Sequence, residues 1–347
     1  MRGPGRSANV WGMSEYLSNT TLEESAERLR ATGSVLITTH SKPDGDALGS
    51  VVALGRALET MGKAVERRVL PPLPPTLEFL AGRTTLVVHE GEAARRPIEP
   101  EPDLVVVLDT GAWSQLADLR DWLEPRHAKT IVIDHHLHGD DVGASRYVDG
   151  EAAAACEPTA ELIDLLGVDF DAAIADALFV GIASDTGWFR FSNTRPRTHR
   201  LAARLQELGV DHAGLYRRLE QAERPEKLAL LERALANMTT VASGRAAVMT
   251  LRAADFKATG AHDHETERLI DLPQMVGDIE VVALLIENGN GTRMSLRSKP
   301  GDAATDVNAL ARRFGGGGHA RAAGAKPDQP LDQVKPKLIE AIEQALT

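Results

Sequence analysis

The sequence has a single cysteine, Cys156, among its 347 residues. One thiol cannot build a disulfide framework, and it cannot supply the several thiolates of a structural zinc site. Any metal ion bound by this chain must therefore be held by histidine and carboxylate side chains. Cys156 itself is expected to be a small buried residue.

Long apolar runs are also missing from the sequence. No stretch approaches the roughly 20 apolar residues that a helix needs to cross a bilayer, and no secretory hydrophobic region follows the first residues. We therefore expect no membrane partner and a cytoplasmic location.

The chain is short of positive charge, because 39 lysines and arginines face 50 aspartates and glutamates, a formal net charge of −11. Proteins that bind duplex nucleic acid over a broad surface normally present a basic face, so this class is disfavoured. A small phosphorylated ligand is still compatible, since bound cations can reverse the sign of a local acidic cluster. Aromatic residues make up only 4% of the chain. Trp188 and Phe189 are therefore expected in the core, with stacking on a nucleobase as the alternative.

Length and composition predict two folded domains. A chain of 347 residues exceeds one average domain, and 43% hydrophobic with 26% charged residues is typical of globular proteins. Residues 1–20 lack periodicity, contain a second methionine, Met13, and are expected to form a loose tail. We then predict a first domain over 21–205, a helical linker over 206–240 and a second domain over 241–347.

The apolar pattern predicts a doubly wound, mostly parallel α/β fold for the first domain. Continuous runs rich in β-branched residues indicate parallel strands that helices cover on both faces. Strands are predicted at 35–39, 103–108 and 130–133, and helices at 21–31, 47–61, 116–123 and 171–184. Further helices, predicted at 196–208 and 225–238, lead away from this domain.

The pattern changes after residue 245. The runs at 246–251, 281–287 and 292–298 are predicted to be strands, and the turn sequence NGNG separates the last two. A last helix is predicted to begin near Leu331. This combination indicates a second, smaller α/β domain, with a cleft between the two domains.

Polar side chains follow the three predicted strands of the first domain. The first strand is followed by His40, Asp44 and Asp46, the second by Asp109, and the third by Asp134, His135 and His136. The carboxyl ends of parallel strands line one crevice, so these residues are expected on one rim, where Asp185 adds a carboxylate from the end of a helix. Each aspartate taken singly is more often a helix cap or a turn residue. Only their coincidence indicates a site.

Carboxylates crowded on one rim would repel one another and take up protons, a conflict that two divalent cations remove. A mixture of imidazole and carboxylate ligands favours Mn²⁺, with Mg²⁺ or Co²⁺ as alternatives. Two such ions about 3.5–4 Å apart can share a bridging hydroxide and clamp a phosphoryl group for in-line displacement. The constellation therefore predicts metal-dependent hydrolysis of a phosphoester.

Five motifs in this order resemble a known family. "HSKPDGDALGS", "VLDTG", "DHH" and "SDTGWF" resemble the four motifs of the DHH phosphoesterase superfamily, and "GGGGHARAAGA" at 315–325 resembles the signature of its associated C-terminal domain. The resemblance runs from about residue 22 to the end of the chain. It is greatest to the branch of bacterial nano-RNA phosphodiesterases that also dephosphorylate 3′-phosphoadenosine 5′-phosphate. The resemblance implies a hydrolase for short single-stranded RNA, dinucleotides and small nucleotides.

The resemblance also implies roles for the rim residues. One metal ion would be held by His40, Asp44, Asp109 and Asp185, and the other by Asp46, Asp109, His135 and Asp185, so that two aspartates bridge. Asp134 would orient an adjacent imidazole. His136 would face the scissile phosphate and stabilise the charge that develops on it.

A second group of candidate residues lies in the C-terminal domain. Gly316, Gly317 and Gly318 would allow backbone N–H groups to approach an anion, and His319 and Arg321 would add donors. The alternative for this glycine run is a tight turn after a helix. Arg297, Ser298 and Lys299 lie on a predicted strand of the same domain. By resemblance, these groups bind the terminal phosphate or sugar of the substrate.

Three questions stay open at the level of sequence. A phosphodiesterase for cyclic or linear dinucleotides would use the same metal site, and a nucleotide-binding regulator without activity would keep the same fold. A pyrophosphatase is disfavoured by the glycine-rich signature, and an exonuclease for long strands by the lack of additional binding domains. Exposed helices such as those over 196–238 could support a homodimer.

Overall fold

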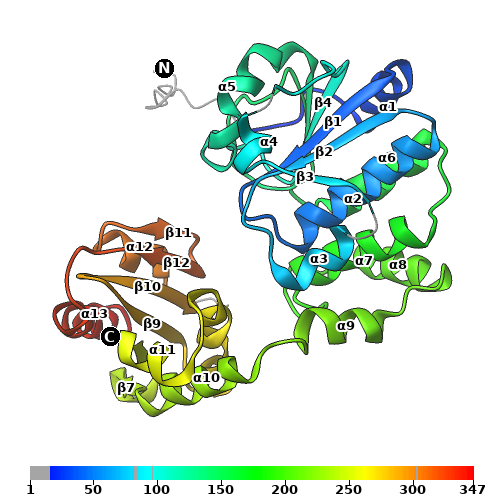
Figure 1. The fold of residues 1–347 in the computed structure, drawn as a ribbon. Coiled ribbons are helices and arrows are strands. Elements are labelled where there is room, and N and C mark those ends of the chain that lie inside the picture. Colours follow the sequence, from blue (N-terminus) through cyan, green and yellow to red (C-terminus); the bar gives the residue numbers. More distant parts are fainter. Residues whose placement is uncertain (1–15, 82–83, 96, 300, 302–303) are drawn as a thin grey trace, which may run out of the picture. The chain divides into compact units, whose positions relative to one another are not determined.

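The computed structural model describes residues 16–347 except residues 82–83, 96, 300 and 302–303 (Figure 1). The chain divides into two compact units between Ala222 and Glu223. This point lies between helices α9 (His212–Glu220) and α10 (Pro225–Ala236). Every helix of the described residues is too short or too polar to span a bilayer.

The first unit is built on a parallel sheet, as the sequence predicted. Its strands, within the described residues, are β1 (Ser34–Thr39), β2 (Ala64–Val69), β3 (Leu86–Val88), β4 (Leu104–Leu108), β5 (Thr130–Asp134) and β6 (Ser145–Val148). Their spatial order is β3-β2-β1-β4-β5-β6, with every neighbouring pair parallel. The direction of winding therefore reverses between β1 and β4, the position at which open α/β sheets bind ligands.

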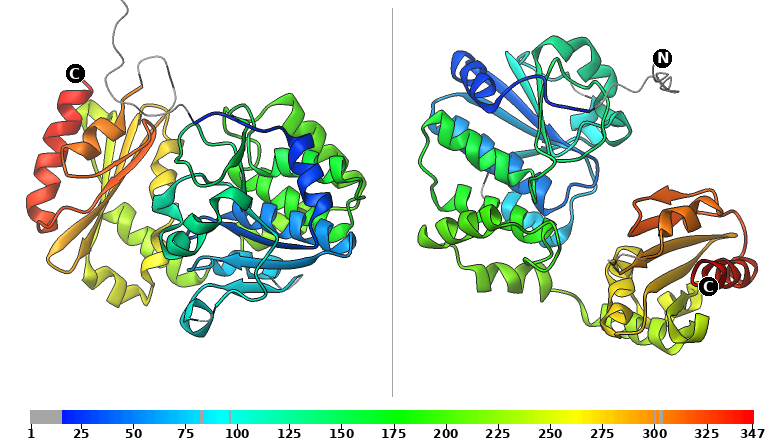
Figure 2. Two further views of the ribbon diagram at one scale, coloured as in Figure 1. Left: turned by 90° about the horizontal axis from the view of Figure 1, so that it is seen from above. Right: turned by 180° about the vertical axis from the view of Figure 1, so that it is seen from behind.

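Helices cover both faces of this sheet (Figures 1 and 2). Alternate residues of each central strand pack to opposite sides: Val106 and Ile133 contact the core beneath the long helices, whereas Val105 and Val132 pack on the other face. The helices of this unit are α1 (Leu22–Ala31), α2 (Gly45–Thr60), α3 (Glu78–Ala81), α4 (Gly91–Arg95), α5 (Arg120–Leu123), α6 (Cys156–Leu166), α7 (Ala172–Asp185), α8 (Pro196–Glu207) and α9.

Local sequence explains where the helices next to the rim begin. The Asp44 carboxylate accepts hydrogen bonds from the backbone N–H groups of Asp46 and Ala47, at 3.0 and 3.1 Å, and so caps α2. Asp171 caps α7 in the same way, with Ala173 and Ile174 as donors. Helices α2 and α7 pack side by side, and Gly49 allows this approach, because a Cβ there would lie 2.4 Å from the Ala177 carbonyl oxygen.

Strands β2, β3 and β6 were not predicted from the sequence. Strand β2 has the sequence AVERRV. Its charged residues suggest an exposed segment, yet the side chains of Arg67 and Arg68 are buried. Arg67 pairs with Glu59 at 2.7 Å, and Arg68 pairs with Glu66 at 2.6 Å. Charged residues in a strand can therefore be buried when each finds a carboxylate, which composition alone does not reveal.

The second unit contains a mixed sheet in the order β11-β12-β10-β9-β8-β7, in which only the pair β8 and β9 is parallel among the described strands. The helices α12 and α13 pack on one face of the sheet, and α10 packs on the other. The bounds are α11 (Ala253–Thr259), α12 (Val307–Arg312) and α13 (Leu331–Ala345), with β7 (Thr239–Val241), β8 (Ala246–Leu251), β9 (Val281–Asn288), β10 (Gly291–Ser298), β11 (Gly317–Gly318) and β12 (Ala322–Ala325).

The predicted tail needs a correction. Residues 1–15 lie outside the described residues, but residues 16–20 pack against the first unit. Asn19 donates a backbone hydrogen bond of 2.8 Å to the Arg146 carbonyl oxygen on strand β6, and the Tyr16 side chain is buried with 8% of its surface exposed. The prediction of a loose tail is therefore wrong for residues 16–20.

Candidate metal centre

The rim residues meet at the carboxyl ends of β1, β4 and β5, on both sides of the point where the winding reverses. His40 follows β1 directly, and α2 then carries Asp44 at its N-cap and Asp46 in its first turn. Asp109 follows β4, and Asp134, the last residue of β5, precedes His135 and His136. Asp185 arrives separately, as the last residue of α7.

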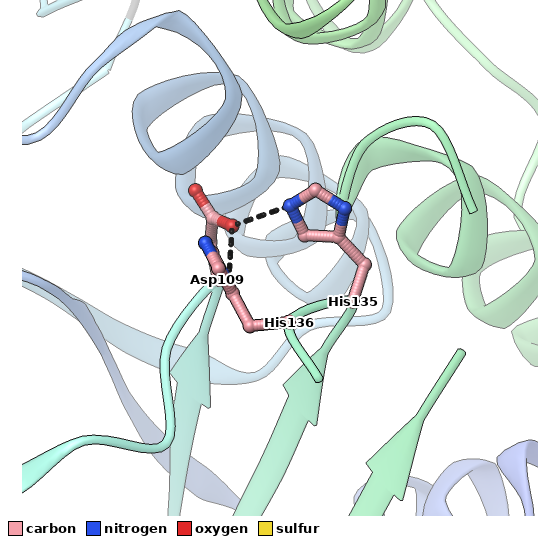
Figure 3. Close-up of side chains that lie close together, drawn as sticks. All are labelled: Asp109, His135 and His136. Atoms are coloured by element: carbon pink, nitrogen blue, oxygen red, sulfur yellow. Dashed lines mark ion pairs between the residues drawn. The ribbon is translucent and has the colours of Figure 1, made fainter. Parts of the chain in front are cut away.

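Asp109 lies between the imidazoles of this cluster, and Figure 3 shows it with His135 and His136. Its Oδ2 atom is 3.5 Å from His40 Nε2, and its Oδ1 atom is 3.3 Å from His135 Nε2. Its backbone has a φ of 60°, a left-handed conformation that a residue with a Cβ seldom adopts, and its N–H donates to the Ile133 carbonyl oxygen at 3.0 Å. This bend turns the Asp109 side chain away from the strand axis and into the site.

The His135 ring stands among three carboxylates. Its Nε2 atom is 3.3 Å from Asp109, 3.5 Å from Asp185 and 3.8 Å from Asp46. The other ring nitrogen, Nδ1, is 3.3 Å from the Ala152 carbonyl oxygen. A carbonyl partner on Nδ1 favours a proton there, which leaves Nε2 as the nitrogen with a free lone pair.

Three groups of these side chains are close enough to hold a metal ion: His40 with Asp44 and Asp109, Asp46 with His135 and Asp185, and Asp109 with His135 and His136. In the third group, however, His136 Nδ1 already lies 2.8 Å from Asp134 Oδ1. That nitrogen is therefore engaged, whereas the members of the first two groups direct their ligand atoms towards one another.

The electrostatics of the cluster fit divalent cations. Burial, followed by the nearby charges of Asp109 and Asp185, raises the pKa of Asp46 well above its usual value. Burial likewise raises the pKa of Asp185 to about 7. Burial acts in the same direction on Asp109, yet the imidazoles of His135 and His40 beside it hold its pKa at about 2. Without cations, the cluster balances its charge by keeping protons on some of these groups.

The pKa values of His40 and His135 are shifted as well. Burial alone would lower their pKa values, but Asp109 and its neighbours raise the pKa of His40 to about 9 and that of His135 to about 10. Asp109 Oδ1 is buried and has no hydrogen bond of good geometry. A buried carboxylate oxygen normally has a partner. A metal ion bound by this oxygen and the nearby imidazole nitrogens would provide one.

Backbone groups that no motif predicted hold Asp46 in place. The N–H groups of Ala155 and Cys156, at the start of α6, donate to its two carboxylate oxygens at 2.5 and 2.9 Å. The N-cap of α6 has no side-chain hydrogen bond from its own residue, so the Asp46 oxygens accept from the N–H groups that this helix N-terminus leaves free. The side-chain amide of Asn193 donates to the carbonyl oxygens of Ala153 and Asp185, both at 3.0 Å. Asn193 thereby ties the loop before α6 to the end of α7.

Trp188 and Phe189 are half-buried and pack against the core of the first unit. Both contact the Phe179 ring, with ring centroids 6.2 and 6.1 Å apart, and the Trp188 Nε1 group donates to Glu220 at 2.9 Å. The base-stacking alternative for these two side chains therefore has no support in the structure.

Of the candidate residues of the second unit, Arg297 and Ser298 lie beside residues 320–322, which follow the glycine run. Arg321 Nη1 donates to the Thr305 carbonyl oxygen at 3.1 Å and lies 3.4 Å from Ser298 Oγ. Arg297 is opposite Ala322 in the sheet, and its side chain is 38% exposed. Lys299 Nζ contacts the carbonyl oxygens of Val276 and Gly277 at 2.5 and 3.1 Å. Both cations therefore have partners, because Arg297 Nη1 also donates to the Leu296 carbonyl oxygen at 3.1 Å.

Two of the glycines are required by close backbone packing. A Cβ on Gly316 would lie 2.1 Å from the Gly324 carbonyl oxygen, and a Cβ on Gly318 would lie 2.6 Å from that of Ala322. The backbone of His319 closes the hairpin by donating to the Ala322 carbonyl oxygen at 2.8 Å. Gly317, in contrast, has no atom within 3.7 Å of such a Cβ, so packing does not explain it.

Comparisons with known proteins agree with this architecture. A model of the DHH family N-terminal domain matches residues 34–182, and a model of the DHHA1 domain matches residues 245–347. The bifunctional oligoribonuclease and PAP phosphatase NrnA of Thermus thermophilus is 34% identical over 326 residues, which are 93% of this chain and 93% of that protein.

Two solved structures share the fold. An exopolyphosphatase-related protein from Bacteroides fragilis has a TM-score of 0.86 at 23% identity, over 94% of this chain and 97% of that one. The exonuclease RecJ bound to manganese has a TM-score of 0.57 at 19% identity, over 96% of each chain. Because both domain models match in order and the Thermus relative aligns over nearly its whole length, this chain belongs to the DHH family and is a phosphoesterase.

Proposed function

We propose that this enzyme hydrolyses short oligoribonucleotides to mononucleotides and removes the 3′-phosphate of 3′-phosphoadenosine 5′-phosphate. The observation that carries the proposal is the joining of two imidazoles and four carboxylates around Asp109, in a chain 34% identical to an oligoribonuclease and PAP phosphatase. The formal charge of −11 is compatible with a short substrate, which needs only a local basic pocket.

The two groups of ligands centred on Asp109 and Asp185 would hold two divalent ions, with Mn²⁺ as the first choice. His40 and Asp44 would bind one ion, Asp46 and His135 would bind the other, and Asp109 and Asp185 would contribute to both. Ions bound there would supply a nucleophilic hydroxide at neutral pH and would neutralise charge on the phosphoryl oxygens. Burial of Asp46 and Asp109 keeps both carboxylates in one orientation.

His136 would act on the substrate instead of on a metal ion. Its Nδ1 atom is held by Asp134 at 2.8 Å, which leaves Nε2 as its free donor, and 49% of its side chain is exposed. The hydrogen bond to Asp134 raises the pKa of His136, so the ring can carry a positive charge. A charged donor placed there stabilises negative charge that develops on a phosphoryl oxygen.

The second unit would select the substrate. Arg297, Ser298, Lys299 and Arg321, with the backbone of the 316–319 loop, would bind the terminal phosphate or sugar. The accessible guanidinium of Arg297 is suited to bidentate contact with a phosphate.

A side-by-side assay tests this proposal. Rates with Mn²⁺ would be measured for RNA of two to five nucleotides, for 3′-phosphoadenosine 5′-phosphate and for cyclic di-AMP. We expect turnover of the short RNAs and of the bisphosphate. A tenfold preference for the cyclic compound would replace this proposal with a cyclic-dinucleotide phosphodiesterase, and the absence of turnover on every substrate would indicate a nucleotide-binding regulator.

A further inference from the structure

A tyrosine outside both family-model matches reaches the candidate site. Tyr16 precedes the first matched residue by 18 positions, and its hydroxyl donates a hydrogen bond of 2.7 Å to Asp134 Oδ2. The two residues are 118 positions apart in the sequence. The Asp134 carboxylate also accepts a hydrogen bond from His136. Tyr16 therefore contacts the residue that orients His136.

The hydrogen bonds of Asp134 divide cleanly between its two oxygens. Oδ1 accepts from the backbone N–H groups of His135 and His136, at 2.8 and 3.2 Å, and from His136 Nδ1 at 2.8 Å. Oδ2 accepts from Tyr16. Asp134 is fully buried. Without the tyrosine hydroxyl, Oδ2 would be a buried oxygen that loses this donor, and the carboxylate would be held through Oδ1 alone.

The Tyr16 ring is wedged between two loops that carry site residues. A Cβ on Gly111, two residues after Asp109, would lie 1.8 Å from the tyrosine hydroxyl, and a Cβ on Gly139 would lie 2.4 Å from its ring. The same two loops are joined by a backbone hydrogen bond of 2.6 Å from Asp140 to Gly111. Tyr16 therefore fills a space that the glycines leave open.

The segment around Tyr16 is anchored along the edge strand β6. Ser18 Oγ both accepts from the Val148 N–H and donates to its carbonyl oxygen, at 2.8 and 3.1 Å. Arg146 donates to the Leu17 carbonyl oxygen at 2.9 Å and lies over the Tyr16 ring at 4.9 Å. Burial raises the pKa of Tyr16, so its hydroxyl stays protonated and acts as a donor at any working pH.

We propose that Tyr16 is a positioning residue for the phosphoesterase reaction: its hydroxyl locks the Asp134 carboxylate, and Asp134 in turn holds His136 with Nε2 directed to the substrate. The proposal deepens the role given to His136 above and rests on it. It assigns a function to the segment before the family domain, and it predicts an effect on the turnover step and not on substrate binding.

Tyr16→Phe tests the proposal, because it keeps the ring and removes only the hydroxyl. Assayed with Mn²⁺ on a chromogenic phosphodiester and on the short RNAs, it should lower kcat about tenfold, as expected for the loss of one hydrogen bond to a charged group, with KM changed less than about twofold. Tyr216→Phe, a tyrosine on α9, is the matched control and should keep kcat within about twofold. A wild-type kcat for Tyr16→Phe would overturn the proposal and leave a packing role.

A double-mutant cycle separates action through Asp134 from a general effect on the fold. In an Asp134→Asn or a His136→Ala background, adding Tyr16→Phe should cost less than about twofold, since the group it positions is already lost. An undiminished tenfold effect in both backgrounds would refute the route through Asp134. The nitrogen NMR spectrum of the His136 ring gives a readout without turnover, and an unchanged ring signal in Tyr16→Phe would also refute it. Failure of the wild type on RNA alone would instead count against the proposed substrate.

Discussion

The metal rim of the first unit and the glycine loop of the second differ in how they hold their polar groups. On the rim, Asp46 and Asp109 are buried, and their positions are set by backbone N–H groups and a left-handed bend. Around the loop, Arg297 is partly exposed and Lys299 contacts carbonyl oxygens at the surface. Burial creates the shifted pKa values of the rim, whereas the cations near the loop are partly exposed and donate to backbone carbonyl oxygens. Under the proposed function, the rim would carry out the chemistry and the loop would recognise the substrate.

The largest effect should come from Asp109→Ala. Under the proposed function Asp109 would contribute to both metal ions, and substitutions one shell further out already cost about 10–100-fold in many metalloenzymes, so we expect activity to fall by more than about 100-fold. Steady-state rates with saturating Mn²⁺ measure this. Asp169→Ala, an exposed aspartate of the same unit, is the control and should be unaffected. Retention of most activity by Asp109→Ala would place the reaction elsewhere.

His136→Ala should follow, with kcat reduced about 100-fold and KM little changed. The reason is that a donor aimed at charge developing in the transition state acts on turnover more than on binding. His138→Ala, two positions away and exposed, is the matched control. If His136→Ala chiefly weakened Mn²⁺ binding, the side chain would be a metal ligand and not a substrate contact.

Arg297→Ala should distinguish the contribution of the second unit from that of the metal rim. The KM for short RNA should rise about tenfold, the cost of a hydrogen bond to a charged group, while the rate on a chromogenic phosphodiester stays near that of the wild type. Arg313→Ala provides the control, because Arg313 is exposed and donates to Gln344 in the same unit. Equal losses on both substrates would show that the two regions do not divide the work in this way.

The last prediction concerns the dependence of Mn²⁺ affinity on pH. Asp185 has a raised pKa of about 7, and that of His135 is raised to about 10, so both hold protons in the metal-free protein at lower pH. Metal binding must displace these protons, and affinity should therefore fall as the pH drops from 8 to 6, by at most about tenfold per pH unit for each proton released. Calorimetry in two buffers of different ionisation enthalpy counts the protons. An affinity that does not change with pH would contradict the shifted values.

Particular residues show how far the sequence alone could be interpreted. The runs that became β1, β4 and β5 were predictable because they are continuous and apolar, and so were the histidines and aspartates that follow them. Strand β2 was not, because its buried Arg67 and Arg68 are paired with glutamates that only the fold brings near. The contacts of Asp46 with Ala155 and Cys156 were hidden for a similar reason, since backbone N–H groups leave no mark in a motif.

By itself the sequence determined the parallel sheet of the first unit, the second α/β unit, the family and the residues that end each central strand, because periodicity and motifs are local properties of the chain. Only the tertiary structure decided that Asp109 turns into the centre of the rim, that α6 supports Asp46, and that Tyr16 donates to Asp134. These contacts join segments up to 118 residues apart, and burial away from water gives them their strength. Neither the distance nor the burial can be read from the order of residues.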